Sequence, residues 1–293
     1  MRIIAYLIIC FLSIGESTKA QSKKAENSLL WEISGNGLKK SSYLFGTYHF
    51  AGKDFIDTMK VLQSKLNAVD AIAGEIIIDK SMAGKLIPYM VMKNNFLDKL
   101  LTAEQYELVA SHLKKVSGYD LKMFNSMKPV AIQMTMLQFT APKTISETNP
   151  ALDQSIQDYG KAHNKKIIGL ETIEDQANVL FGNSLERQKE LLLKGIKDEE
   201  RNKKESQTLY ENYIAQNMKE LEKLFVKLDG YTQEELDQLL KNRNIKWMAQ
   251  LPNLMENQST FIAVGAGHLL GNDGLIKGLR KLGYRVKPLA TNN

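Results

Sequence analysis

The sequence predicts an α/β fold in which a mostly parallel sheet is built from both ends of the chain, around a large helical insertion. Short apolar segments of strand length occur near both termini. The segments at about 80–163 and 183–251 instead show apolar residues at helical spacing. Because the strands are separated by more than a hundred residues, we expect one domain over residues 21–293 rather than two.

The N-terminal elements are predicted to form a hairpin followed by a parallel crossover. Residues 29–33 and 42–45 resemble strands, and the glycines within 35–37 favour a turn between them. Apolar residues at helical spacing predict a helix over 54–67. The apolar run at 69–78 then predicts a strand parallel to the second one, since a helix connects the two.

The C-terminal half continues the alternation of strands and helices. Residues 166–170 predict a third segment of the parallel sheet. Helical spacing follows at 173–181, 185–228, 233–251 and 274–282. Two further strands are predicted at 260–264 and 284–289.

The composition is that of an ordinary globular protein. Of 293 residues, 43% are hydrophobic and 25% are charged, and the net charge is +6. Disorder, collagen and coiled coil are poor descriptions of such a chain. The one cysteine, Cys10, leaves no internal disulfide and no cysteine-based zinc site, so a metal would need His, Asp or Glu ligands.

Residues 1–20 have the pattern of a signal peptide. Arg2 precedes an apolar run over 3–14, and Thr18-Lys19-Ala20 is a plausible cleavage site. We therefore expect an exported protein, periplasmic or extracellular, with no stable membrane span after cleavage. The alternatives are a retained anchor and a lipoprotein site at Cys10, where the preceding isoleucine is too bulky.

The basic residues do not indicate a nucleic-acid partner. Lysine pairs at 114–115, 165–166 and 203–204 are scattered among acidic residues and lack interleaved aromatic residues. Nucleic-acid binding usually requires a concentrated basic face. Solvated helix surface is the better interpretation, and no nucleic-acid partner is expected.

Two histidines follow predicted strands by the same step. His49 closes a Gly-x-x-His sequence after the second strand, and His268 closes another after the strand at 260–264. Glycine permits a sharp exit from a strand, and ligands of open α/β sheets bind at the carboxyl ends of strands. Each histidine alone could be structural, but together they favour a site.

Three charged residues are expected beside these histidines. Glu75 interrupts the apolar run at 69–78, and Glu171 directly follows the sheet segment at 166–170. A buried carboxylate is unfavourable unless it is paired or ligated, and a structural ion pair is the alternative interpretation. Arg243 lies on the apolar stripe of the helix at 233–251, where it either reaches along the surface or points into a carboxylate-bearing site.

These residues resemble the TraB/GumN family. The sequences that carry the resemblance occur in family order and span about 28–289. They are 30–37, 43–49, Lys128-Pro129, Leu152-Asp153, 169–172, Arg243-Asn244 and 264–269. The family is similar to the Tiki metalloproteases and pheromone-shutdown proteins, and more distantly to erythromycin esterases and haem-binding ChaN-like proteins. Val130 departs from the family, in which tryptophan is common at that position.

The resemblance implies an α/β fold and a hydrolase activity that uses a divalent metal, with His49, Glu75, Glu171, Arg243 and His268 at the site. Our hypothesis makes His49, Glu171 and His268 the metal ligands, with manganese, cobalt or zinc as suitable ions. Glu75 is expected to be the general base, since its apolar strand should raise its pKa. Arg243 would hold a glutamate ionised or stabilise the oxyanion. The assignment of the two glutamates could be reversed.

The expected substrate is a peptide or protein, and two other functions remain open. The first is a non-catalytic periplasmic protein that binds a peptide, a metal or haem in the same pocket. The second is a structural envelope protein whose polar cluster is a buried ion network. The helices of the insertion are expected to wall the strand ends and to set substrate choice.

Overall fold

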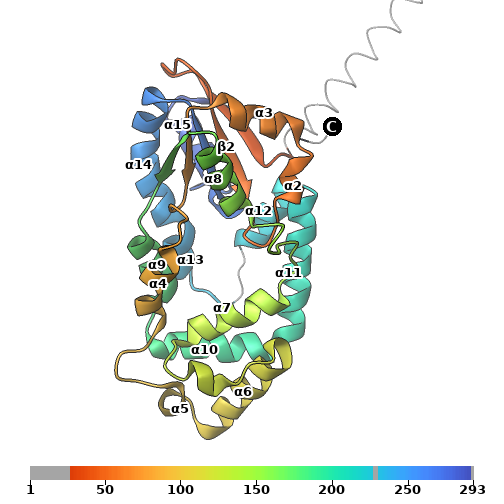
Figure 1. The fold of residues 1–293 in the computed structure, drawn as a ribbon, viewed down its shortest axis with the longest axis vertical. Helices are drawn as coiled ribbons and strands as arrows, with labels where there is room; N and C mark the ends of the chain where they lie inside the picture. The colour runs from red at the N-terminus through yellow and green to blue at the C-terminus, as the bar shows by residue number, and fades with distance from the viewer. Residues whose placement is uncertain (1–26, 227–229, 292–293) are drawn as a thin grey trace, which may run out of the picture.

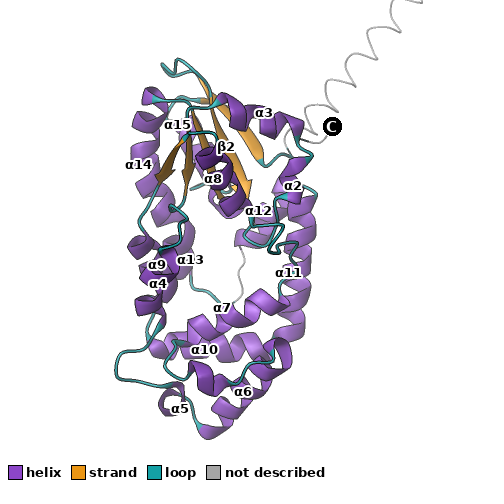
Figure 2. Ribbon diagram, in the orientation of Figure 1, coloured by secondary structure: helices purple, strands orange, loops and turns teal. Residues whose placement is uncertain are grey.

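The computed structural model describes residues 27–226 and 230–291 (Figure 1). The predicted signal peptide at 1–20 lies outside the described residues. Within the part that is described, no helix is both long and apolar enough to cross a membrane. Figure 2 shows that the strands occupy one end of the molecule, while helices alone form the other end.

A six-stranded sheet with strands from both ends of the chain carries the site. The strands are β1 Leu30–Ser34, β2 Ser42–Thr47, β3 Ala71–Gly74, β4 Lys166–Gly169, β5 Thr260–Gly265 and β6 Arg285–Pro288. Their order is β4-β3-β5-β2-β1-β6. The first four strands in this order are parallel to one another, and β1 is antiparallel to both β2 and β6. The predicted α/β class and N-terminal hairpin are confirmed.

Four helices pack against the sheet. They are α3 Lys60–Ala68, α8 Leu152–Ala162, α14 Asn242–Asn257 and α15 Leu275–Lys281. α8 packs against β3 and β4, and α15 packs against β6 and α14. Trp247 of α14 is fully buried in the same apolar core as Ile72 and Phe261 of the strands. The predicted helical segments 80–163 and 183–251 therefore each include a helix that covers the sheet.

The remaining helices extend from the strand ends to the other end of the molecule, where some of them enclose a separate apolar core. They are α2 Asp54–Asp57, α4 Met82–Met90, α5 Leu97–Leu100, α6 Ala103–Ser117, α7 Pro129–Thr140, α9 Ile173–Phe181, α10 Leu185–Lys197, α11 Glu199–Ile214, α12 Met218–Val226 and α13 Gln233–Leu236, with 3₁₀-helices η1 Leu121–Phe124 and η3 Ala266–Leu269 and the π-helix η2 Asp237–Lys241. The second core includes Leu97, Val109 and Leu192. α11 runs from this end back toward the sheet (Figure 1).

β3 is shorter than the predicted strand at 69–78, because a side chain of α8 takes over its backbone partners. The Gln157 amide donates to the Ile76 carbonyl at 2.8 Å and accepts from the Ile78 N–H at 2.9 Å. A Cβ at Gly74 would lie 2.6 Å from the Gln157 Nε2, so glycine is needed at this approach. Glu75 therefore lies one residue beyond its strand instead of interrupting it.

The parallel strands point their carboxyl ends toward the helical end of the molecule (Figure 2). The η3 segment that follows β5 contacts α12 and η2, and η2 also contacts α9. Helices from the middle of the chain therefore stand beside the strand ends, as expected of a wall around a site at this edge.

Candidate active site at the strand ends

Two glutamates lie side by side because the parallel pairing of β3 and β4 continues past both strands. Gly74 and Gly169 are partners in the ladder. Beyond them, the Glu171 N–H donates to the Glu75 carbonyl at 2.9 Å. The carboxylates of Glu75 and Glu171 are both buried, with 8% and 4% of the side chain exposed. Two adjacent buried carboxylates require a cation between them.

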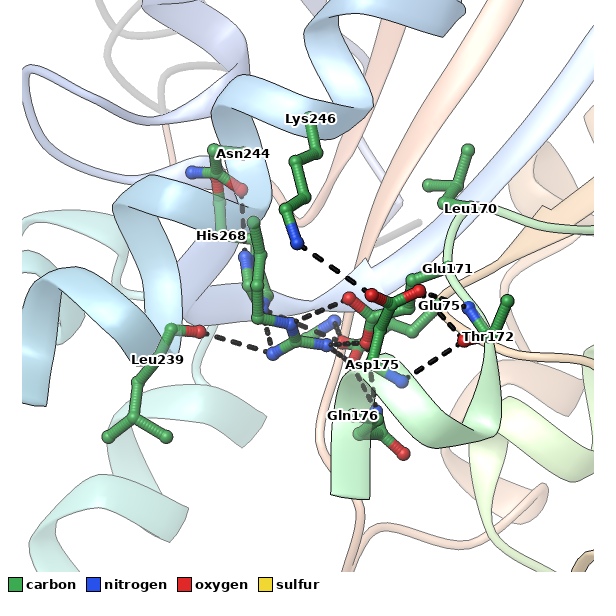
Figure 3. A network of polar contacts seen from close by, with 12 residues as sticks. Glu75, Leu170, Glu171, Thr172, Asp175, Gln176, Leu239, Asn244, Lys246 and His268 are labelled. Carbon is green, nitrogen blue, oxygen red and sulfur yellow. Dashed lines mark hydrogen bonds and ion pairs between the residues drawn. The ribbon is translucent and has the colours of Figure 1, made fainter. Parts of the chain in front are cut away.

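Arg243 supplies that cation from the first turn of α14. Figure 3 shows Glu75, Glu171 and His268 converging at this place. The Arg243 Nη2 lies 2.6 Å from Glu171 and 2.5 Å from Glu75, and its Nε lies 3.0 Å from the second Glu171 oxygen. Its Nη1 donates to the Leu239 carbonyl at 3.1 Å and to the His268 Nε2 at 3.0 Å. All five N–H groups of the guanidinium therefore have acceptors, in the geometry that suits arginine to carboxylates.

A π-helical turn immediately precedes Arg243. The sequence predicts one continuous helix over 233–251, but η2 interrupts it before α14 begins. The carbonyl of Leu239, within η2, is the one that accepts from Arg243. π-turns are rare overall, but those that occur are often at functional sites, since they change the direction of side chains and carbonyls along a helix.

His268 is held as a neutral imidazole by two fixed partners. The Asn244 amide nitrogen donates to the carbonyls of His268 and Asp273, so its oxygen must be the atom 2.8 Å from the His268 Nδ1. The Nδ1 therefore carries the proton, and the Nε2 accepts from Arg243. Burial lowers the pKa of His268 to about 3, in agreement with this tautomer. The ring also packs 4.4 Å from that of Trp247.

The pKa of Glu75 is shifted opposite to the sequence prediction. Burial does raise it, as expected from the apolar strand, but the charge that His268 carries when protonated and the charge of Arg243 outweigh burial and lower the pKa to about 2. The Gly265 N–H adds to this by donating to the Glu75 Oε1 at 2.8 Å. Glu75 is therefore a fixed negative charge and a poor general base, because an effective base has a pKa near the working pH.

The charges of this cluster do not cancel. Glu75 and Glu171 contribute two negative charges, Arg243 contributes one positive charge, and His268 is neutral. One negative charge is left in a buried place, which a purely structural ion pair would not require. An electrostatic imbalance of this kind at a sheet edge indicates a functional site.

His49 stands apart from the hydrogen-bonded cluster. Its Nδ1 lies 2.9 Å from the Asp153 carboxylate, and 66% of its side chain is exposed. The charge of Asp153 raises the pKa of His49 to about 9, and the charges of Glu75 and Arg243 also act on it. The structure thus brings four of the five predicted residues together and leaves the fifth beside them, close enough for electrostatic coupling.

Three further residues complete the network. Gln176 donates to Glu75 at 3.2 Å and bridges toward Glu171, Asn244 fixes His268, and Asp153 holds His49. Asn244 and Asp153 belong to short motifs that the sequence analysis noted, Arg243-Asn244 and Leu152-Asp153, but neither was assigned a role. Gln176 lies within a predicted helix, and no sequence signal distinguishes it.

The side chains do not fit the predicted metal site in this arrangement. Both Glu171 oxygens and the His268 Nε2 are directed at Arg243, which takes the place that a cation would occupy. Within residues 27–226 and 230–291, no group of three or more His, Cys, Asp or Glu side chains is placed so that it could hold a metal ion. The set of His49, Glu171 and His268 therefore remains a prediction from the sequence.

Removal of the Arg243 guanidinium is expected to destabilise the protein strongly. Arg243→Ala leaves two buried carboxylates without a cation, and breaking a buried ion pair typically costs about 3–5 kcal/mol. Lys241→Ala is the matched control, since the Lys241 ammonium pairs only with Asp237 and Asp273 within the described residues. Urea denaturation of both variants measures the difference. Equal and small losses would show that Arg243 contributes no more than a surface residue.

Acidification is expected to lower the free energy of unfolding over two pH ranges, the first because of His268 and the second because of Glu75. The pKa of His268 is about 3 in the folded protein and 6.5 in the unfolded chain. Below about pH 6.5 the unfolded chain therefore binds a proton that the folded protein does not, and the free energy of unfolding decreases. Glu75 adds to this loss below about pH 4.5, because its folded pKa is about 2. Between pH 6.5 and 4.5 the loss should be about 2–3 kcal/mol.

The variant His268→Gln separates the two pH ranges. It cannot titrate in this range, so the slope of its stability between pH 6.5 and 4.5 should be nearly flat, while the slope below pH 4.5 is kept. Denaturation curves at several pH values test this. A wild-type slope in the variant would show that His268 is not the titrating group.

Comparisons with known proteins find relatives along nearly the whole chain. The chain is 24% identical to "Metalloprotease TIKI2" of Danio rerio over 94% of its own length, but it spans only 63% of that protein. It is 22% identical to an uncharacterised protein of Treponema pallidum (strain Nichols), over 95% of this chain and 88% of that protein. No solved structure matches significantly. A sequence profile matches residues 29–288, and the chain belongs to the TraB/PrgY/gumN family.

Proposed function

We propose that this protein is an exported hydrolase that acts on peptide bonds, with its active site at the carboxyl ends of β2, β3, β4 and β5. The observation that carries the proposal is the convergence of Glu75, Glu171, Arg243 and His268 on one buried network, with His49 beside it. The metalloprotease name of the zebrafish relative supports the substrate class.

His49 is the group best placed to transfer protons. Its ring is exposed, its Nδ1 faces a carboxylate, and its Nε2 makes no hydrogen bond to the described residues. In its neutral form, which the raised pKa favours only near and above pH 9, a histidine held in this way can take a proton from an attacking water and return it to the leaving amine. Glu75 contributes through its charge, which favours the imidazolium that forms during this step.

Metal dependence is part of the proposal only because the zebrafish relative is named a metalloprotease. Manganese, cobalt or zinc would suit imidazole and carboxylate ligands. Arg243, however, holds the atoms of Glu171 and His268 that were predicted to bind the ion. The steps supported by the geometry therefore use the chain's own groups, and purified protein should be assayed with chelator and with each metal added.

Hydrolysis is expected to depend on His49. In a screen of fluorogenic peptides, His49→Ala should lower kcat by about 10²- to 10⁴-fold, the usual contribution of a general acid–base group. His163→Ala is the control, because His163 is exposed at the end of α8 and, among the described residues, its ring hydrogen-bonds only to the Tyr159 carbonyl. Wild-type kcat/KM should rise with pH and level off near pH 9, where His49 becomes neutral.

Two results would contradict this function. Full hydrolysis by His49→Ala would exclude His49 from the reaction. Peptide binding without turnover, under every metal condition, would favour the alternative of a non-catalytic binding protein that uses the same edge of the sheet.

Export is expected to remove the first twenty residues. The basic start, the apolar run and the Thr18-Lys19-Ala20 sequence predict a mature N-terminus near Gln21. N-terminal sequencing or intact-mass measurement of protein from the exported fraction checks this directly. An intact Met1 on exported protein would show that the segment is not cleaved.

A further inference from the structure

We propose that Asp153 is the positioning residue of this site, which fixes the His49 ring so that its Nε2 faces the substrate. This inference rests on the proposed function and deepens it. It assigns a role to a residue for which the sequence motif Leu152-Asp153 gave none.

Each carboxylate oxygen of Asp153 has its own partner. Oδ2 lies 2.9 Å from the His49 Nδ1, and Oδ1 accepts from the Thr47 hydroxyl at 2.7 Å. Thr47 is the last residue of β2 and is only 2% exposed. The carboxylate is thereby locked to the sheet on one side, while its other oxygen is presented to the histidine two residues further along.

The start of α8 is tied to the segment that carries His49. The Leu152 N–H donates to the Ala51 carbonyl at 3.1 Å, and the Lys53 N–H donates to the Pro150 carbonyl at 2.9 Å. Asp153 therefore keeps its place relative to His49 through the backbone as well.

An ionised carboxylate determines which ring nitrogen carries the proton. Asp153 can only accept, so the His49 Nδ1 must donate, and the Nε2 is left as the acceptor in the neutral ring. Glu75, Arg243 and His268 also interact with the charge of His49. Of the charged groups that act on His49, Asp153 is the one that hydrogen-bonds to it.

An incidental surface ion pair is the competing explanation, and the contacts argue against it. Exposed ion pairs are usually formed between long side chains that are free to move, and they contribute little. Asp153 has only 16% of its side chain exposed. A second acceptor bond to a buried threonine serves no surface pair, but it does hold the carboxylate in one orientation.

The first test is kinetic and uses Asp153→Asn, which keeps the shape of the side chain but can donate to Nδ1. This substitution favours the opposite tautomer, so kcat on the fluorogenic peptide library should fall by about 10²- to 10⁴-fold with KM changed less than threefold. Asp158→Asn on the same helix is the matched control, since Asp158 is exposed and contacts Gln154 and Lys161 at the surface. It should behave as wild type.

The second test needs neither substrate nor metal. The ring protons of His49, followed by NMR during a pH titration, should show a midpoint near 9 in wild type and one shifted toward 6.5 in Asp153→Asn. Thr47→Val should shift it in the same direction by a smaller amount, because it loosens the carboxylate without removing it. His49→Ala identifies the resonance.

The outcomes separate this inference from the proposed function. An unmoved midpoint in Asp153→Asn overturns the positioning role, even if peptides are hydrolysed. A further loss of kcat on adding Asp153→Asn to His49→Ala also overturns it, since a residue that acts through His49 has no effect without it. A shifted midpoint in a protein that hydrolyses no peptide would support the positioning role and contradict the hydrolase.

Discussion

The guanidinium of Arg243 is the interaction on which the candidate site depends. Its charge lets two carboxylates from adjacent strands lie side by side in a buried place, since each would otherwise be protonated or expelled. It reaches them from α14, whose apolar face belongs to the core of the sheet. The packing of α14 on the sheet and the geometry of the charged cluster are therefore set together, and neither can shift without the other.

This arrangement gives the two Gly-x-x-His motifs different chemistry. His268 follows β5 into a short 3₁₀-helix, where Asn244 and Arg243 occupy both ring nitrogens and burial keeps the ring neutral. His49 follows β2 into an exposed loop, where Asp153 binds one nitrogen and favours the charged ring. Equal spacing from a glycine thus places two histidines at one edge of the sheet without giving them equal roles.

Much of the fold follows from patterns that a sequence displays directly. The strands near both termini, the hairpin and the gathering of Glu75, Glu171 and His268 at strand ends depend on apolar runs and on glycines that end strands. The early end of β3 was missed because residues 75–78 stay apolar apart from Glu75, and only Gln157 of a distant helix diverts them. The π-turn before Arg243 has no distinct periodicity to reveal it.

The chemistry of the site was harder to predict than its location, because it too depends on contacts between residues that are far apart in the sequence. An apolar strand suggests that a carboxyl group is neutral, but the pKa of Glu75 is set by partners about 170 and 190 residues away along the chain. The sequence identifies which residues are polar among apolar neighbours, whereas the sign of a pKa shift depends on which of them meet. A cluster that already contains its own cation can hold buried carboxylates without a metal, so acidic and histidine residues at strand ends do not by themselves establish a metal site.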